Sequence, residues 1–251
     1  MESGEIERAA RDLLSAQKAI AFTGAGISVE SGIPDFRSPT GLWSKYDPDQ
    51  YATIDAFKAD PGKVWEMLVE MIGLVTRAKP NPAHHGLASL ETMGRLHAVV
   101  TQNIDGLHQA AGSRKVIEIH GSGASLSCLS CGSRIAATSF SMEKLPPRCP
   151  ECRSIMKPDV VFFGEPLPLS AYEAALEAAR ECDLVLAIGT SAEVYPAAEI
   201  PITAKRAGAK LVEINVEPTS LTGRFSDYLI QGRSGEILPR VVELVRGLMY
   251  Q

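Results

Sequence analysis

The sequence contains no long apolar run, and none of its hydrophobic segments approaches the roughly 20 residues that a membrane-crossing helix needs. Its N-terminal segment, MESGEIERAARDLL, is acidic and amphipathic, whereas a secretory signal starts with basic residues followed by an apolar stretch. Basic blocks are also missing, and the 251-residue chain carries a formal net charge of −5. We therefore expect a cytoplasmic protein without a general electrostatic attraction to nucleic acid or to acidic membranes.

Cysteine is scarce, but its spacing is informative. Four of the five cysteines form two CxxC pairs, Cys128 with Cys131 and Cys149 with Cys152, and seventeen residues separate the pairs. This spacing is typical of one zinc ion held by four thiolates, which leave no open position for water or substrate. The sequence thus predicts a structural zinc site, with two redox pairs or four core cysteines as the alternatives. Cys182 has no partner in sequence and is expected to be a buried apolar residue.

Zinc-binding segments of this kind also occur in nucleic-acid-binding proteins, which makes an interaction module a competing interpretation. The segment is only mildly basic, and Phe140 is the one aromatic residue between the first and the last of the four paired cysteines. Stacking on bases therefore has few side chains to use. We interpret the segment as a scaffold and predict no direct nucleic-acid partner.

The chain is rich in short apolar segments that alternate with amphipathic ones. Strands are predicted at 18–23, 96–101, 116–119, 184–188, 210–214 and 228–230, and helices at 4–16, 61–77, 82–93, 170–181, 196–207 and 235–248. Between them, the proline-containing residues 34–60 are expected to form a long ordered loop with short helices. Strands that alternate with helices of this length favour an α/β fold, with a parallel sheet covered by helices on both faces.

Small and polar residues follow most of the predicted strands. The first strand runs into Gly24-Ala25-Gly26, a turn that lets a diphosphate approach backbone N–H groups at a helix N-terminus. Val29 replaces the third glycine of the usual motif, and a tight turn without a ligand explains this segment alone equally well. Similar ends are found at 101–105, 120–121, 189–191 and 215–217. Because ligands of open parallel sheets bind outside the carboxyl ends of the strands, their convergence predicts a binding site there.

These segments, in their order along the chain, resemble those of the sirtuins, which are NAD-dependent protein-lysine deacylases. They read GAGISVESGIPDFR at 24–37, TQNIDGLHQAAG at 101–112, HG at 120–121, VVFFGE at 160–165, GTS at 189–191 and INVE at 214–217. The two cysteine pairs lie between the third and the fourth segment. The resemblance extends over nearly the whole chain, and it rests on the combination of motifs, since each one alone is unspecific.

The resemblance implies a Rossmann-like domain made of residues 1–36, 80–122 and 158–251. A small domain would combine a helical insertion at 37–79 with the zinc-binding module at 123–157. NAD would lie between the two domains, and the acetylated lysine of a protein or peptide would enter from the opposite side. NAD would be consumed as a co-substrate, giving nicotinamide, O-acetyl-ADP-ribose and the deacetylated lysine. Oligomeric state is left open.

The resemblance also assigns roles to residues at matching positions. NAD would contact the first turn and its mobile loop, the segment after the second strand, and three later segments: Gly24, Ala25, Gly26, Ser28, Val29, Asp35, Phe36, Arg37, Gln102, Asn103, Ile104, Asp105, Gly189, Thr190, Ser191, Asn215, Val216, Glu217 and Ser234. The peptide would contact His120, Val161, Phe162, Phe163, Gly164, Glu165 and Val194. His120, Asn103 and Asp105 would be catalytic, with His120 as the general base for a ribose hydroxyl.

Each of these residues also has an ordinary structural interpretation. His120 could be a satisfied histidine at a strand end, Asn103 a turn former and Asp105 a helix N-cap. Asp35 could cap a loop, and Phe36 could be a core residue. The segment at 160–163 could be a buried strand. The other four histidines, His84, His85, His97 and His108, are given only the structural interpretation.

The acyl group can be predicted from a departure. Sirtuins that remove malonyl or succinyl groups place a Tyr and an Arg three residues apart in the helix after VWE, where this chain has Leu68 and Met71. An uncharged pocket would leave the extra carboxylate unpaired, so we expect deacetylation over desuccinylation. Two other functions remain open: a mono-ADP-ribosyltransferase that uses the same NAD site, and a catalytically idle NAD sensor or zinc-mediated binding module.

Overall fold

The computed structural model describes residues 2–140 and 145–250, so residues 141–144 of the predicted zinc-binding module lie outside it. Its centre is a parallel sheet with the strand order β3-β2-β1-β7-β8-β9. These strands are β1 (Ala19–Thr23), β2 (Ala98–Thr101), β3 (Val116–Glu118), β7 (Leu184–Ile188), β8 (Lys210–Asn215) and β9 (Tyr228–Gln231). The central strands β1, β2 and β7 are buried along their whole length, as continuous apolar strands of a sheet covered on both faces should be. The predicted parallel sheet is confirmed.

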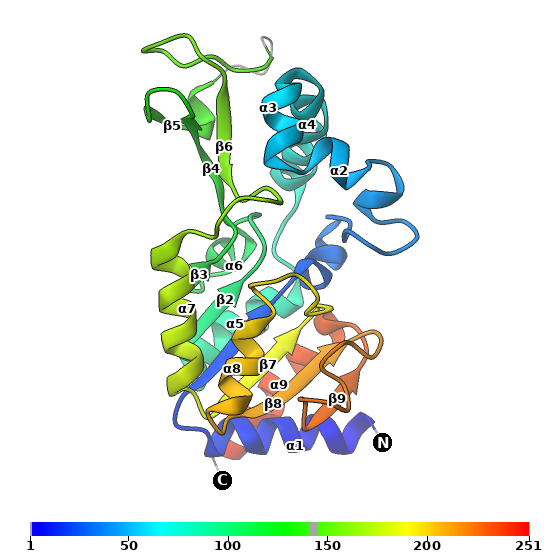
Figure 1. The fold of residues 1–251 in the computed structure, drawn as a ribbon. Coiled ribbons are helices and arrows are strands. Elements are labelled where there is room, and N and C mark those ends of the chain that lie inside the picture. The colour runs from blue at the N-terminus through cyan, green and yellow to red at the C-terminus, as the bar shows by residue number, and fades with distance from the viewer. Residues whose placement is uncertain (1, 141–144, 251) are drawn as a thin grey trace.

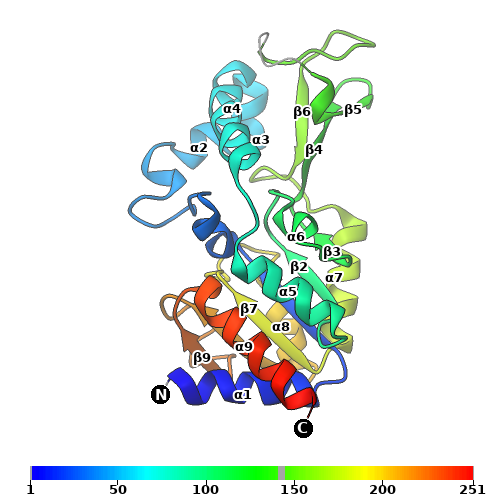
Figure 2. The same ribbon diagram turned by 180° about the vertical axis from the view of Figure 1, so that it is seen from behind.

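Helices cover both faces of this sheet (Figures 1 and 2). One face carries α1 (Glu2–Ser15), α5 (Pro82–Thr92) and α9 (Ser234–Met249), whose apolar sides form one core cluster with the strands. On the other face, α7 (Leu169–Glu181) and α8 (Glu199–Arg206) form a second cluster. In the described part of the chain, no helix is long and apolar enough to cross a membrane.

A second, antiparallel sheet of three strands has the order β5-β4-β6 and consists of β4 (Gly121–Cys128), β5 (Arg134–Ala136) and β6 (Met156–Val160). No strand was predicted within the cysteine segment, because β4 reads GSGASLSC and lacks a clear apolar alternation. Strand β4 begins directly after His120, and β6 ends directly before Val161, so the two strands connect these residues with the cysteine segment. The 3-10 helix η3 (Ala137–Ser139) follows β5.

The proline-containing segment folds as predicted into short helices. They are η2 (Leu42–Ser44), α2 (Pro48–Tyr51) and α3 (Ile54–Ala59), and the longer α4 (Pro61–Arg77) follows them. Helices α2, α3 and α4 stand beside β4, β5 and β6 above the large sheet (Figure 1). The two groups share a third apolar cluster, in which the fully buried Trp65 of α4 donates a hydrogen bond from Nε1 to the Met156 carbonyl oxygen of β6 at 3.1 Å.

Trp65 therefore joins α4 to β6 by a hydrogen bond as well as by apolar contact, and we predict that Trp65→Ala destabilises this part by about 3–5 kcal/mol, since it empties a large buried volume. Trp65→Phe should cost less, because it retains most of the apolar contact and loses only the hydrogen bond. Hydrogen exchange of the α4 and β6 amides measures both effects. Equal exchange in Trp65→Ala and in the unaltered chain would contradict the prediction.

Candidate functional site

The candidate site lies where the strand order reverses, between β1 and β7. The chain winds from β1 to β3 on one side and from β7 to β9 on the other, and such a switch point opens a crevice at the carboxyl ends of the strands. The turns that follow β1 and β7 are in direct contact here. Gly24 donates its N–H to the Ile188 carbonyl oxygen at 3.1 Å, and Gly26 donates to the Gly189 carbonyl oxygen at 2.9 Å.

Glycine is required in these turns by their packing against each other. A Cβ on Gly26 would lie 2.8 Å from the Gly189 Cα, and a Cβ on Gly189 would lie 2.4 Å from the Ile27 nitrogen. Gly189 also has a φ of +57°, which favours glycine. From the sequence, the close approach of a ligand is the reason expected for Gly24 and Gly26. The structure adds a second reason, the contact with the turn after β7.

The predicted turn-to-helix transition after β1 takes the form of a 3-10 helix, η1 (Ala25–Ser31), which carries Ala25, Ser28 and Val29. Ser28 is buried and donates from Oγ to the Asp105 Oδ2 at 2.7 Å. Asn103 donates from Nδ2 to the Ser28 Oγ and to the Gly24 carbonyl oxygen, both at 3.1 Å. The two predicted catalytic residues after β2 are thus joined to η1 by one network.

The second oxygen of Asp105 has a structural task. Its Oδ1 accepts the N–H of Leu107 at 2.9 Å, at the start of the short helix α6 (Leu107–Ala110). The N-cap residue of α6 is Gly106, so the N-cap interpretation of Asp105 is wrong, although one of its oxygens supports the helix start and the other accepts from Ser28. Ile104, between Asn103 and Asp105, is exposed.

Two buried histidines that the sequence analysis kept outside the site lie directly beneath this network. A ring nitrogen of His84 lies 3.5 Å from the Ser28 Oγ, and the Nε2 of His108 lies 2.9 Å from the Thr23 Oγ1. Burial lowers the pKa of His84 to about 4 and that of His108 to about 3, so both rings are neutral at neutral pH. Their structural interpretation is confirmed, and their contact with the site is new.

His84 also anchors η1 through a capping box at the start of α5. Asn81 accepts the N–H of His84 while the His84 Nδ1 accepts the N–H of Asn81 at 3.3 Å. The Asn81 side chain reaches across to the Ile27 carbonyl oxygen at 2.7 Å and the Ser31 Oγ at 3.0 Å. The order Asn81-Pro82 before a helical segment is a sequence signal for such an N-terminus, and it could have identified this support.

The loop after η1 reaches the turn after β7. Arg37 donates to the Ser191 Oγ at 3.0 Å and forms an ion pair with Glu193 at 3.4 Å. From the β2 side, Gln102 donates to the Thr190 Oγ1 at 2.9 Å. Predicted NAD contacts from three separate segments therefore come together around Thr190 and Ser191.

In this loop, the structural interpretation is confirmed for Asp35 and wrong for Phe36. Asp35 accepts the N–H of Ser38 at 2.9 Å, so it does cap the loop. Phe36 is 42% exposed and packs against Trp43, with 5.2 Å between ring centroids, so the interpretation as a core residue is wrong.

The remaining predicted NAD contacts lie beyond β8 and at the start of α9. Asn215 donates to the Glu217 carbonyl oxygen at 3.1 Å, and Val216 between them is exposed. Ser234 is buried as the first residue of α9. The next amide in that helix, of Gly235, donates to Glu30 at 2.8 Å, a contact from η1 that the sequence analysis did not predict.

His120 follows β3 and is half-buried. Its Nδ1 lies 3.0 Å from the Gln102 carbonyl oxygen, which can only accept, so Nδ1 carries the proton and Nε2 keeps its lone pair. Burial lowers the pKa of His120, and this outweighs the opposite effect of the bond to Gln102. No described residue bonds to Nε2. The ring can therefore act as a base through that atom at neutral pH.

The predicted peptide segment begins directly beside His120. Strand β6 ends at Val160, so Val161 to Phe163 are not a continuous buried strand. Val161 donates to the His120 carbonyl oxygen and Phe163 to the Ala52 carbonyl oxygen, both at 2.9 Å. Phe163 is 45% exposed and Phe162 is buried. Across the turn after β7, Val194 is half-buried.

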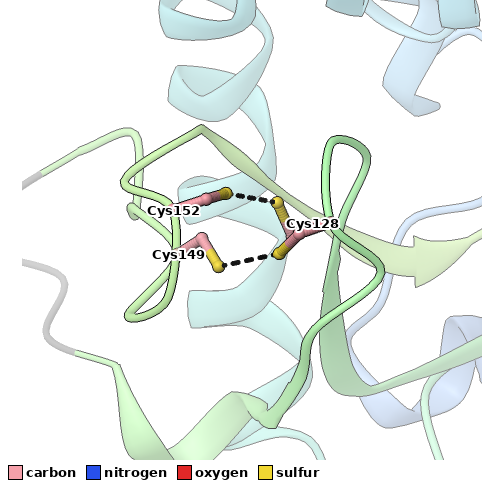
Figure 3. Close-up of side chains that lie close together, drawn as sticks. Cys128, Cys149 and Cys152 are labelled. Atoms are coloured by element: carbon pink, nitrogen blue, oxygen red, sulfur yellow. Dashed lines mark hydrogen bonds between the residues drawn. The ribbon is translucent and has the colours of Figure 1, made fainter.

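The four paired cysteines come together in one cluster, and all four sulfur atoms lie within 4.8 Å of one another. None of them forms a disulfide. The Cys128 and Cys152 sulfurs are 3.4 Å apart (Figure 3). Those of Cys131 and Cys149 are 3.5 Å apart. A tetrahedral zinc site with Zn–S bonds of about 2.3 Å has sulfurs about 3.8 Å apart, so the cluster fits zinc. Cys182 is buried and separate from it, as predicted.

Known proteins resemble this chain in sequence and in fold. Residues 24–196 match the sequence profile of the Sir2 family. The chain is 50% identical over 234 residues to NAD-dependent protein deacylase 2 of Pyrobaculum aerophilum, and the match covers 93% of each protein. A solved structure of a Sir2 enzyme superposes with a TM-score of 0.93 at 49% identity, over 99% of this chain and 100% of the other.

Two further solved structures contain ligands. A Sir2 homologue in complex with NAD has a TM-score of 0.90 and 40% identity, covering 97% of this chain and 94% of its own. A Sir2 variant with a deacetylated p53 peptide and 3′-O-acetyl-ADP-ribose has a TM-score of 0.90 and 38% identity, covering 95% of this chain and 97% of its own. The profile match, the identity and the shared fold all extend over most of the chain, and the chain therefore belongs to the Sir2 family.

Proposed function

We propose that this protein removes acetyl groups from lysine side chains of proteins and consumes NAD in doing so, giving nicotinamide, O-acetyl-ADP-ribose and deacetylated lysine. The observation that carries the proposal is the neutral His120, with a free Nε2, beside the Ser28, Asn103 and Asp105 network at the switch point. Support comes from the relatives named NAD-dependent protein deacylase and deacetylase. The Sir2 complex with deacetylated peptide and 3′-O-acetyl-ADP-ribose supports the same products.

We assign the diphosphate of NAD to the interlocked turns, where Gly24, Ala25 and Gly26 meet Gly189 and Thr190 at the amino end of η1. The nicotinamide and its ribose are assigned to Ser28, Gln102, Asn103, Ile104 and Asp105, and the loop with Asp35, Phe36 and Arg37 covers them. The outer half of NAD is assigned to Ser191, Asn215, Val216, Glu217 and the start of α9, with Val29 at the rim of the site. Because Ser234 is buried, its contact is expected through the backbone.

NAD supplies an electrophilic ribose carbon. The carbonyl oxygen of the acetyl group on lysine attacks this carbon, and the bond from the carbon to nicotinamide breaks. The chain contributes orientation and a proton acceptor. His120 accepts a proton from a ribose hydroxyl at Nε2, while the Gln102 carbonyl oxygen holds Nδ1–H and fixes the ring. Asn103 and Asp105 are placed to hold the ribose, because their side chains share Ser28 as a partner.

We assign the acetyl-lysine peptide to the groove walls formed by Val161, Phe162, Phe163, Gly164 and Glu165 on one side and Val194 on the other. Main-chain pairing with these segments gives affinity with little sequence preference. The division into a Rossmann-like domain (1–36, 80–122, 158–251) and a small domain (37–79, 123–157) is part of the proposal. A reducing, cytoplasmic location suits four free thiolates, and no direct nucleic-acid partner is proposed.

We predict that His120→Ala lowers kcat/KM for an acetylated peptide by about 10²–10⁴-fold, the usual contribution of a general base. In the unaltered chain the base must be neutral, so activity is lost only as the pH falls through the lowered pKa of His120. The acid limb of the pH profile should therefore lie below 6.5, the value of an unperturbed histidine, and should disappear in His120→Ala.

His97→Ala is the matched control, because His97 is exposed and bonds to Lys115 away from the site. Formation of O-acetyl-ADP-ribose from NAD and an acetylated peptide, followed across pH, measures both parts of the prediction. Turnover without NAD would refute the proposed function. Label from NAD that stays on protein would instead favour ADP-ribosyl transfer.

The acyl preference depends on α4. Leu68 is buried and Met71 is partly buried in the apolar cluster of the small domain, so neither can pair with a carboxylate. We predict that succinyl-lysine peptides react with a kcat/KM at least about tenfold below that of acetyl-lysine peptides. Leu68→Tyr with Met71→Arg should narrow this difference. Equal rates on the two peptides in the unaltered chain would contradict the prediction.

Zinc has a structural task in this proposal, because four thiolates leave it no open position. We predict that Cys131→Ser abolishes stoichiometric zinc binding, speeds hydrogen exchange in β4, β6 and α4, and thereby lowers deacetylation. Cys182→Ala, which removes the cysteine outside the cluster, should keep both zinc and activity. Metal analysis together with exchange and activity measures the outcome, and full activity of metal-free Cys131→Ser would contradict a structural role.

A further inference from the structure

Lys157 is a buried lysine for which the proposed chemistry has no use. It lies in β6 between Met156 and Pro158, and only 7% of the residue is exposed. Lysine is almost never buried to this degree unless its charge is paired. Burying its charge costs free energy of folding unless the charge is paired, so its partners indicate which part of the chain it stabilises.

The ammonium group of Lys157 contacts both β6 itself and the segment that follows β6. Its Nζ donates to the Pro158 carbonyl oxygen at 3.1 Å and to the Val160 carbonyl oxygen at 2.7 Å. It forms an ion pair with the Glu165 Oε2 at 3.0 Å, and it lies 4.5 Å from the ring centroid of Phe162. All four partners belong to β6 or to the proposed peptide segment.

Glu165 closes the same segment into a turn. Its Oε2 accepts the N–H of Phe162 at 2.8 Å, while its own N–H donates to the Phe162 carbonyl oxygen at 3.0 Å. Gly164, at the bend, has a φ of +87°, which only glycine adopts readily. Lys157 and Phe162 therefore meet at one carboxylate oxygen, and this fixes the direction in which the segment leaves β6.

The segment held in this way is bonded to both neighbouring parts of the molecule. On one side Val161 bonds to the backbone of His120, and on the other Phe163 bonds to Ala52 ahead of α3. Within the described residues, no hydrogen bond is made by the N–H of Gly164 or by the carbonyl oxygen of Val161. These two groups have no partner among the described residues, and both belong to the segment that the turn of Lys157 and Glu165 holds.

We propose that Lys157 is a positioning residue for the acyl-lysine peptide: through Glu165 and the carbonyl oxygens of Pro158 and Val160, it sets the backbone of 161–165 against which the substrate strand pairs. The proposal rests on the proposed function for its substrate. It also gives β6 a second task, since the same strand runs from the zinc-binding segment, where Met156 pairs with Cys128, to the substrate.

The test compares Lys157→Met, which keeps an unbranched side chain only one atom shorter and removes its charge, with Lys157→Arg, which keeps a charge. Lys157→Met should raise KM for an acetylated peptide about tenfold to a hundredfold, the effect of losing charged hydrogen bonds, and leave KM for NAD within about twofold. Lys157→Arg should recover part of the loss. A defect in folding alone would lower the apparent kcat, because less of the protein is active, and would leave both KM values unchanged; that result would overturn the proposal.

Lys210→Met is the matched control. Lys210 also pairs with a mostly buried carboxylate, that of Asp12, but at the amino end of β8, on the opposite edge of the sheet from the site. We expect it to lower thermal stability without changing KM for the peptide. An equal rise in peptide KM in Lys210→Met would show that any lost ion pair has this effect, and would also overturn the proposal.

Hydrogen exchange keeps the two proposals apart, since it needs no substrate. In Lys157→Met the amides of Phe162 and Glu165 should exchange at least about tenfold faster, because the turn opens more often, while those of η1 stay unchanged. Unchanged exchange at 161–165 overturns the role of Lys157 whatever the activity. If the unaltered chain deacetylates no peptide but Lys157→Met shows the faster exchange, the proposed function fails while the positioning of the segment is upheld.

Discussion

The contact between the two turns at the centre of the sheet is the constraint on which the rest of the site depends. Strands β1 and β7 are neighbours in register, with Thr23 opposite Ile188, so the turns that follow them must pass each other at backbone distance. Only glycine at positions 26 and 189 permits this, and the result places η1 over the switch point. Thr23 is also level with Thr101 of β2, and this second register brings the segment after β2 next to η1. The polar network around Ser28 follows from these two registers.

The zinc-binding cysteines were the strongest single motif in the sequence, yet we assign them a supporting part. Their four sulfurs surround one position and would leave a zinc ion there no open coordination site, and the chemistry that we propose is assigned to the strand ends around His120. Strand β6 connects the two regions. At one end Met156 pairs with Cys128, and at the other end Val160 pairs with Gly121, the residue that follows His120. In the proposed function, zinc would act on the peptide segment at a distance, by holding the end of β6 that pairs with Cys128.

The sequence predicted the parts whose signal is local. Apolar strands that end in glycine or polar residues are visible at Thr23, Ile188 and Asn215, and the doubled CxxC spacing identified the metal cluster. The antiparallel sheet escaped prediction because its pairing is non-local and β4 is built of glycine and serine, which carry no apolar period. His84 and His108 escaped for a related reason. Their contacts come from α5 and α6 folding against β1 and η1, which no spacing in the sequence encodes.

Two opposing effects act on the pKa of His120, the proposed base. The bond from Nδ1–H to the Gln102 carbonyl oxygen favours the charged ring, whereas burial disfavours it, and burial is the stronger. The first selects the tautomer whose Nε2 is free, and the second keeps Nε2 unprotonated, as the proposed role of a base requires. Both arise from the position of His120, which follows β3 and lies beside Gln102 after β2, with its backbone joined to Val161 of the peptide segment. One residue thus joins the proposed base to the proposed peptide segment, because its ring carries the free Nε2 and its backbone carbonyl oxygen accepts the N–H of Val161.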